Sequence, residues 1–435
     1  MDVYLRDYGI KPNTDEVIHA KIQKAIDDCA NSGGGTVYFE TGTYICGTLY
    51  MRDNTYLNLP PRCVVKGSGD LDDYNEPDAW VQNAPIPSEY ATGKHLIAGV
   101  EVKNCGIFGG GIIDGNGAHF GYRQEPDFKR PSQMVYFCES ENITILNLEL
   151  VNSPYWTCHI HGCDKVIISG LRIKNNDWIG CCDGIDVDTS SRVVISDCII
   201  DTQDDCITFR CDNNFFGKLK NKEKILEDVT VTNCQLRTAD CNAMRIGVGN
   251  GQIKNCVVSN LIIKDSAKGV CLESRYAFND DIKIGTKIEN ISFNNIYMET
   301  KLPLFISSHC DGIVNRPCPP VNNIRFTNIT AISDHNVIIQ GSENCIFKNI
   351  NFANCDFTFK GTPEVVDKHG YGEWDYISSS AGFYIANAEN VSLNNVQVHI
   401  EEKNSKIDKG VIETNSAVRY IGFGADKDGE IIDRK

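Results

Sequence analysis

Short strand-like segments recur along this chain at intervals of a few tens of residues, a spacing typical of stacked repeats. Within each segment apolar and polar residues alternate, which gives a strand one buried and one exposed face. Many segments follow an Asn, which tolerates the left-handed backbone of a tight turn, as in Asn142–Asn147 and Asn290–Ile296. Only stacking of such units can bury a continuous core. The segments are Ile143–Ile145, Val166–Ile168, Val193–Ile195, Val229–Val231, Val257–Val258, Ile291–Phe293, Ile324–Phe326 and Val391–Leu393.

This repeat predicts an all-β fold, a single-stranded right-handed parallel β-helix. An all-β sandwich is the structural alternative, but its turns come about every 8–12 residues, and the intervals in this chain are longer. A length of 435 residues would ordinarily suggest two or three domains, yet repeat architectures escape that rule. We therefore predict one β-helix domain over residues 1–435.

The charge balance narrows the possible partners. Lys and Arg number 42 against 58 Asp and Glu, a net charge of −16. No nucleic acid partner is expected, because phosphate binding normally needs a basic stripe and the sequence has none. No apolar run is long enough to cross a bilayer, so no membrane partner is expected either. A long polyanion would need a local group of cations. Arg210, Arg245 and Arg275 are candidates because each follows a probable strand, although solvated surface charge is the alternative. The sequence does not predict the oligomeric state.

Twenty cysteines and the absence of a signal-peptide pattern at the start of the sequence favour a reducing compartment. We expect a cytoplasmic protein, and secretion after removal of a signal is the alternative. Many cysteines lie at strand positions, where the side chain serves as small apolar filler. No two separated CxxC pairs occur, and the strand-borne pair His159 and His161 lacks an evident third ligand. The expectation is therefore no metal site and no cofactor, with His159 in a sugar contact or a surface hydrogen bond.

Three aspartates, Asp183 and the adjacent pair Asp204 and Asp205, form the main candidate for chemistry. Asp183 and the pair each precede a short strand-like run, with a further strand between them. If these strands belong to successive coils, the carboxylates stack as neighbours, and their repulsion leaves an acid beside a base. That is the arrangement that glycoside hydrolysis needs. The alternative is that these residues only satisfy local backbone donors in turns.

The segments around the aspartates carry a family resemblance. Ser153-Pro154-Tyr155-Trp156 is followed by a strand, then by Cys182-Asp183-Gly184-Ile185-Asp186, a second strand and Gln203-Asp204-Asp205-Cys206. This order resembles the polygalacturonase-like glycoside hydrolases of family 28, in which it reads Ser-Pro-x-Trp, Asn-Thr-Asp-Gly-Ile-Asp and Gly-Asp-Asp-Cys. The resemblance runs from about residue 3 to about residue 400, with Asp114-Gly115-Asn116-Gly117 and Arg130-Pro131 also in place.

The resemblance also implies how the chain is laid out. Residues 1–70 would form an amino-terminal cap with a short helix over Ile22–Cys29 and the first coils. Residues 71–400 would form the central coils, and residues 401–435 a tail. Loops over residues 72–94, 212–227 and 358–380 are long enough to close a cleft into a pocket, which would favour short oligosaccharides.

By the same resemblance, Asp205 would protonate the glycosidic oxygen while Asp183 and Asp204 activate water, with inversion at the anomeric carbon. Both aspartates of the pair can face one cleft only if the backbone bends between them. The residues expected to contact the sugar are Arg210, Asn242, Arg245, Glu273, Arg275, His159 and Trp178, with Trp156 and Tyr276 as further stacking faces. Glu273 is either a sugar ligand or a second acid.

Departures from the family pattern concern the substrate. Asn242 stands where the pattern has His, and Cys271-Leu272-Glu273 stands where it has Arg-Ile-Lys. In the polygalacturonases Arg-Ile-Lys binds a sugar carboxylate, so its loss favours a neutral or singly charged oligosaccharide. Cys181-Cys182 replaces Asn-Thr, and Gln203 replaces Gly.

The functional prediction is a glycoside hydrolase that cleaves a plant-type or pectic oligosaccharide or polysaccharide, acting from the end of short chains. A polysaccharide lyase or a sugar epimerase or transferase on the same fold is one alternative. It would need a base beside the sugar C5 and a cation to stabilise the developing charge. A carbohydrate-binding β-helix without catalysis is the other alternative.

Overall fold

The structure is a computed structural model, which describes the chain except residues 122–127, 213–217, 224, 276–283, 309–317, 320, 361–380, 402–406, 408, 426–431 and 435. It comprises two compact units. Unit 1 contains Met1–Thr208 and Asn213–Lys224, and unit 2 contains Phe209–Asp212 and Ile225–Lys435. The predicted parallel β-helix is confirmed, because the strands pair in parallel with strands of the preceding and following coils. The single domain over residues 1–435 stays a prediction.

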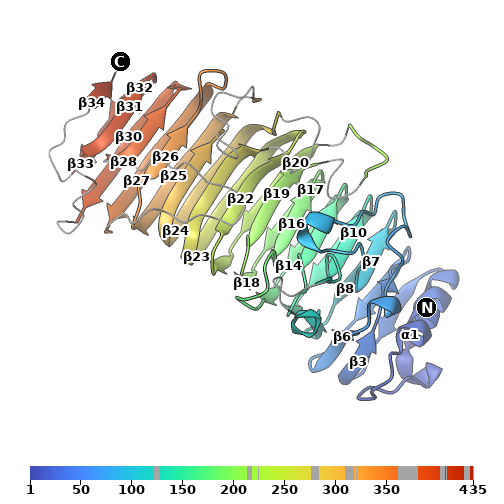
Figure 1. Cartoon of the computed structure of the whole chain (residues 1–435). Coiled ribbons are helices and arrows are strands. Elements are labelled where there is room, and N and C mark those ends of the chain that lie inside the picture. The colour runs from blue at the N-terminus through green and yellow to red at the C-terminus, as the bar shows by residue number, and fades with distance from the viewer. Residues whose placement is uncertain are drawn as a thin grey trace. The chain divides into compact units, whose positions relative to one another are not determined.

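In unit 1 the strands of successive coils form three parallel ladders (Figure 1). The first holds β4 (Leu49–Tyr50), β7 (Ile97–Val100), β10 (Val135–Cys138), β13 (Cys158–His161) and β16 (Ile185–Asp188). The second holds β1 (Val3–Tyr4), β2 (Gly35–Tyr38), β5 (Thr55–Asn58), β8 (Lys103–Phe108), β11 (Glu141–Leu146), β14 (Asp164–Ser169) and β17 (Ser191–Ser196). The third holds β3 (Gly42–Cys46), β6 (Cys63–Gly67), β9 (Ile112–Asp114), β12 (Glu149–Val151), β15 (Arg172–Lys174) and β18 (Ile199–Thr202).

One α-helix covers the first coil of unit 1. Helix α1 (His19–Asn31) buries Ile22, Ala25, Ile26 and Cys29, positions that share one face of a helix. It contacts β1, β2, β4 and β5, so it covers the end of the core. The predicted cap helix is therefore present and extends beyond Ile22–Cys29 at both ends. Unit 1 also contains the short 3₁₀ helices η1 (Leu5–Tyr8), η2 (Leu71–Asp73), η3 (Pro87–Glu89) and η4 (Gly117–Phe120).

Unit 2 repeats the same coil with longer strands. Strand β23 (Gln252–Arg275) pairs along its length with β20 (Leu226–Thr232), β21 (Gln235–Thr238) and β22 (Asn242–Gly249), so it forms one whole coil. The remaining strands are β24 (Lys287–Ser307), β25 (Val321–Ser333), β26 (Val337–Gln340), β27 (Phe347–Phe359), β28 (Ala381–Ala386), β29 (Ala388–Glu389), β30 (Val391–Ile400), β31 (Lys409–Thr414), β32 (Val418–Ile421), β33 (Gly424–Ala425) and β34 (Ile432–Arg434). β31 to β34 lie within the predicted tail and pair with earlier strands. β19 (Ile207–Cys211) contains residues of both units.

The recurrent Asn residues lie at turns, as the repeat predicts. Asn255, Asn260 and Asn295 all have φ of 55–56°. Asn295 Nδ2 donates a hydrogen bond to Asn260 Oδ1 at 2.7 Å, so equivalent turns of successive coils are tied together. Inside the same coils the rings of Phe293 and Phe326 stack at 4.8 Å between centroids. Turn and core positions therefore follow from one sequence pattern.

The cysteines are mostly core residues. Of the seventeen free thiols among the described residues, all but Cys241 are buried. Cys318 and Cys345 form a disulfide. The sequence analysis did not predict this disulfide. The cytoplasmic location stays a prediction. Within the described residues no helix is long and apolar enough to span a membrane.

Candidate active site

The predicted catalytic aspartates lie on adjacent coils of unit 1. Asp183 ends the loop before β16, and its carbonyl oxygen accepts a hydrogen bond from Thr157 N–H at 2.9 Å. Gly184 N–H donates to the carbonyl oxygen of Asp205 at 2.8 Å, and Ile185 N–H donates to that of Cys206 at 2.9 Å. The structure therefore places the segment that follows Asp183 beside the Asp205–Cys206 segment through backbone hydrogen bonds. The catalytic roles of the aspartates stay predictions.

The backbone bends at the aspartate pair. Asp204 and Asp205 lie between β18 and β19 rather than within a strand. Asp205 N–H donates to Asp204 Oδ1 at 3.0 Å, and the Thr202 hydroxyl donates to the carbonyl oxygen of Asp204 at 2.7 Å. The strict alternation of side chains does not apply to such a bend. Asp204 is half-buried, and Asp205 is 5% exposed.

The thiol beside these carboxylates does not act as a nucleophile. Burial raises the pKa of Cys182 well above its ordinary value; Asp183 and Asp204 act in the same direction, and Arg130 acts against it. The protonated Cys182 thiol donates to the carbonyl oxygen of Ser153 at 3.3 Å. Because thiolate, and not thiol, is the reactive form, Cys182 is not a candidate nucleophile. The carboxylates of Asp183 and Asp204 both lie within electrostatic reach of the Cys182 side chain.

A fully buried arginine fixes the loop that leads to Asp183. Arg130 donates through Nε and Nη2 to the carbonyl oxygen of Glu89 at 3.1 and 2.9 Å, and through Nη1 to that of Pro154 at 3.0 Å and to that of Gly180. Its guanidinium lies 4.8 Å from the centre of the Tyr155 ring. Arg130 thus joins three segments that surround the aspartates. The sequence placed Arg130 in the family pattern but gave no sign of this role.

The outward face of the first ladder is covered on one side of the aspartates. Tyr136, His159 and Asp186 occupy equivalent positions of β10, β13 and β16 and are at most 1% exposed. The segment before β7 reaches β10, because the Trp80 ring lies 6.2 Å from the ring of His95, which stacks on Tyr136 at 4.4 Å. Gln82 from this segment donates to Glu139 Oε2 at 2.7 Å, and Leu219 packs on Tyr136. Parts of two loops expected to close a cleft therefore cover this face; residues 213–217 and 361–380 of the expected loops lie outside the described residues.

The two strand-borne histidines belong to this covered face. His159 and His161 stack at 5.2 Å, and each Nε2 lies about 4 Å from Asp188 Oδ2 (3.9 and 4.0 Å). His159 also contacts the Trp156 ring at 5.2 Å. Both histidines are fully buried, as is Glu273, and the sugar contact of His159 stays a prediction. Burial also lowers the pKa of the neighbouring His95 to about 4, which keeps that ring neutral.

The predicted sugar-binding residues of unit 2 include a buried ion pair. Arg245 Nη2 lies 2.8 Å from Glu273 Oε2, with side chains 7% and 0% exposed. Arg245 is in register with Cys271, and Glu273 lies two residues further along β23 on the same face. The acid that replaces Lys in the family pattern is thus paired with an arginine. Whether Glu273 is a sugar ligand or a second acid stays a prediction.

The other predicted cations are also buried. Arg210 and Arg275 are each 7% exposed, and Asn242 is 1% exposed, so solvated surface charge does not describe them. Sequence reasoning missed Lys268, which is in register with Asn242, is buried and lies 5.8 Å from the centre of the Phe305 ring. Lys268 follows Asn242 by the length of one coil, and this spacing is the signal that could have identified Lys268.

The predicted aromatic faces differ in exposure. Trp178 is 46% exposed and remains a candidate stacking face in unit 1. Trp156 is buried against Tyr155, with ring centroids 5.1 Å apart, so it is a core residue. Tyr276 lies outside the described residues.

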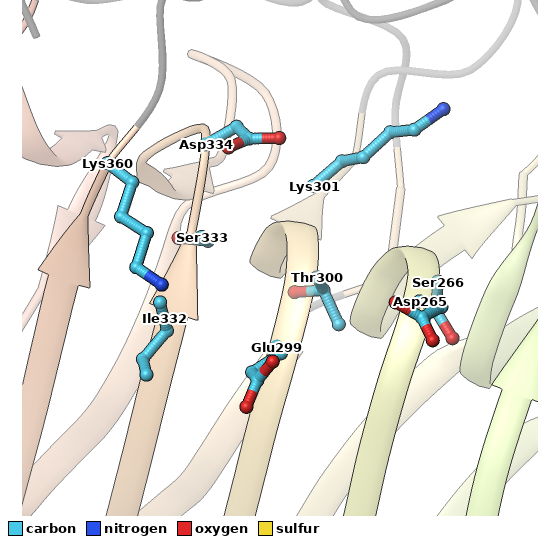
Figure 2. Close-up of a pocket in the computed structure, with 9 residues that line it drawn as sticks. All are labelled: Asp265, Ser266, Glu299, Thr300, Lys301, Ile332, Ser333, Asp334 and Lys360. Atoms are coloured by element: carbon cyan, nitrogen blue, oxygen red, sulfur yellow. The ribbon is translucent and has the colours of Figure 1, made fainter.

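Unit 2 also has an open groove of about 360 Å³ (Figure 2). Two of its polar side chains interact with residues outside the lining. The Tyr297 hydroxyl, followed by Lys264, holds the pKa of Glu299 below its usual range. Ser333 Oγ donates to the carbonyl oxygen of His335 at 2.8 Å, and Figure 2 shows the Lys301 side chain directed away from Glu299. We therefore do not assign chemistry to this groove. Its lining residues are Asp265, Ser266, Glu299, Thr300, Lys301, Ile332, Ser333, Asp334 and Lys360.

Sequence comparison relates this arrangement to known enzymes. The model of glycosyl hydrolases family 28 matches residues 83–369. A polygalacturonase of Arabidopsis thaliana is 25% identical over 289 residues, which are 59% of this chain and 64% of that protein. An endo-xylogalacturonan hydrolase of Aspergillus tubingensis is 24% identical over 340 residues, 75% of each chain. The chain thus spans less than two thirds of the length of the Arabidopsis relative.

Solved structures share the fold. A family 28 exopolygalacturonase of Yersinia enterocolitica has a TM-score of 0.67 and 17% identity, covering 99% of this chain and 79% of that one. A hyperthermoactive exopolygalacturonase of Thermotoga maritima has a TM-score of 0.64 and 17% identity, covering 95% of this chain and 92% of that one. At these identities the likeness concerns the β-helix itself.

Proposed function

The chain belongs to glycosyl hydrolases family 28, and on this premise we propose that it is an inverting glycosidase. Its substrate would be a pectic or other plant-type oligosaccharide, cleaved from the chain end. The observation that carries the proposal is the hydrogen-bonded contact of the Asp183 and Asp205 segments, together with the bend at the aspartate pair.

In this mechanism Asp205 donates a proton to the glycosidic oxygen as the leaving sugar departs. Asp183 and Asp204 accept a proton from the water that attacks the opposite face of the anomeric carbon. Inversion requires a separation of about 6.5–9.5 Å between acid and base, which leaves room for that water. Asp205 is the more buried member of the pair.

Action at the chain end is supported by the covered face of unit 1. A long glycan bound across the first ladder would need the outward positions of β10, β13 and β16, but these side chains are buried. A substrate therefore ends beside the covering segment, and the sugar at that end is the one released. The exopolygalacturonases with the same fold support this mode of action by analogy.

The substrate preference follows from the cations of unit 2. Arg245 is paired with Glu273, so its charge is already balanced, while Arg210, Lys268 and Arg275 are buried cations on the same set of coils. An arginine fork binds one carboxylate well, but a chain of −16 net charge repels a long polyanion. We favour a short oligosaccharide with few carboxylates, and the polygalacturonase and xylogalacturonan hydrolase relatives define the sugars to test first.

Digestion of defined oligosaccharides tests the proposal. The purified protein is incubated with di- to hexagalacturonides, xylogalacturonan fragments and neutral pectic side-chain oligosaccharides, and products are followed by chromatography and proton NMR. We expect single sugars released from one end, with the first-formed anomer opposite to that of the substrate bond. Initial retention would contradict the inverting assignment. Products with a 4,5-unsaturated uronate, visible by ultraviolet absorbance, would identify a lyase, and binding without products would identify a carbohydrate-binding protein.

A further inference from the structure

A second groove, of about 360 Å³, lies in unit 1 away from the aspartates. It lies between the end of α1, the turn after β4 and the side chain of Trp80. Its volume is near the lower end of the range of small-ligand sites, about 300–1,000 Å³, which suits one sugar ring. The residues that line it and enter the argument are Tyr50, Arg52, Asp53, Trp80, Ala98 and Val100.

Two aromatic side chains form one wall of this groove. Trp80 and Tyr50 are half-buried and meet edge to face, with ring centroids 5.7 Å apart. Ala98 and Val100 of β7 supply apolar surface beside them. The C–H face of a pyranose packs well on such rings, whose bodies are apolar and whose polar tips remain wet. Burial raises the pKa of the Tyr50 phenol, so it stays protonated and can donate a hydrogen bond.

An arginine at the rim is held in place with one nitrogen available. Arg52 Nε donates to Asp27 Oδ1 at 2.8 Å, and Nη1 donates to the carbonyl oxygen of Met51 at 3.3 Å. Its guanidinium carbon lies 5.7 Å from the centre of the Tyr50 ring. Nη2 donates to no residue that the structure describes. A fixed donor beside an aromatic wall is the combination that orients a sugar hydroxyl.

The charge around the groove selects against acidic sugars. The single guanidinium of Arg52 is accompanied by the carboxylates of Asp27 and Asp53, and Glu76 lies within electrostatic reach of Tyr50. A uronate would meet more negative than positive charge, whereas a neutral sugar would lose nothing to this repulsion.

We propose that this groove is a carbohydrate-binding site for a neutral pyranose unit, separate from the aspartate site. Aromatic side chains separate the two: Trp80 lies 6.2 Å from the His95 ring, which stacks at 4.4 Å on the buried Tyr136. The groove therefore takes a sugar that does not react, such as a side branch or a second glycan chain. The proposal does not depend on which bond the aspartates cleave.

Binding is measured by isothermal titration calorimetry of the full chain carrying Asp205→Asn, with xylotetraose, galactotetraose and trigalacturonate as probes. We expect at least one neutral probe to bind, and Trp80→Ala to weaken that binding about tenfold through loss of the stacked ring. Arg52→Ala, which leaves the Trp80 contacts in place, should weaken it severalfold. Val81→Ala is the matched control, because Val81 follows Trp80, is 72% exposed and does not line the groove.

The outcomes separate this site from the catalytic proposal. In the Asp205-containing protein, Trp80→Ala should leave hydrolysis of the shortest substrate unchanged at an unchanged melting temperature. The proposal would be overturned if neither neutral probe bound at millimolar concentration. It would also be overturned if the Trp80→Ala and Arg52→Ala variants bound the neutral probe as tightly as the parent protein does. Preferential binding of trigalacturonate that depends on Arg52 would overturn it as well. A protein without glycosidase activity that still binds a neutral probe through Trp80 would refute only the proposed function.

Discussion

The outward-facing positions of the two units differ in charge, although both units have the same turns and the same kind of core. In unit 1 these positions carry acids and imidazoles, with His159 in register with Asp186. In unit 2 they carry the pair Arg245 and Glu273, with cations buried nearby. Inward positions must fill a shared core, so the sequence is constrained there to small and branched apolar residues. Outward positions are free of that constraint, so their side chains can differ between the two units.

The comparison is tested most severely by removing the proposed acid of unit 1. Asp205→Asn keeps the size of the side chain but cannot donate a carboxylic proton, so we expect kcat to fall by about 10²–10⁴-fold. Hydrolysis of the best oligosaccharide is the measurement, with a melting curve to show that the fold is intact. Asp197→Asn is the matched control, because Asp197 is exposed on the same unit with φ of 58°, which Asn tolerates. Normal turnover in Asp205→Asn would remove the catalytic assignment of unit 1.

The second prediction concerns the buried ion pair of unit 2. Arg245→Met should lower the free energy of unfolding by about 3–5 kcal/mol, because Glu273 would be left buried without its partner. The double variant Arg245→Met with Glu273→Gln should regain much of that loss, since the uncompensated charge is gone. Urea unfolding of the two single variants and the double variant gives the coupling. If the losses of unfolding free energy in the two single variants simply add in the double variant, Arg245 and Glu273 do not stabilise each other. The difference in charge between the two units would then have no consequence for stability.

The sequence predicted the features that repeat and few of those that occur once. The Asn turns and alternating strands recur in many coils, so each repeat supports the interpretation of the other repeats. Together they predicted the β-helix. The position of the Asp183 and Asp205 segments on adjacent coils also followed, because one coil separates them. Arg130 was missed because its role depends on loops that fold back from distant parts of the sequence, and no local pattern records such contacts. For the same reason the burial of His159 by residues far from it in sequence was not predicted. Lys268 was missed although it follows Asn242 by the length of one coil.

The smallest of these effects is expected at Arg130, which tests whether the covering segment of unit 1 positions the aspartates. Arg130→Lys keeps the charge but cannot reach the carbonyl oxygens of Glu89, Pro154 and Gly180 at once. We expect the free energy of unfolding to fall by about 1.5–3 kcal/mol, the usual loss for hydrogen bonds that involve a charged group. Because Gly180 leads into the loop of Asp183, kcat should fall more than the affinity for substrate changes. Arg172→Lys, an exposed substitution in the same unit, should alter neither quantity. If Arg130→Lys lowers stability but leaves kcat unchanged, the covering segment limits where the glycan ends without positioning the catalytic groups.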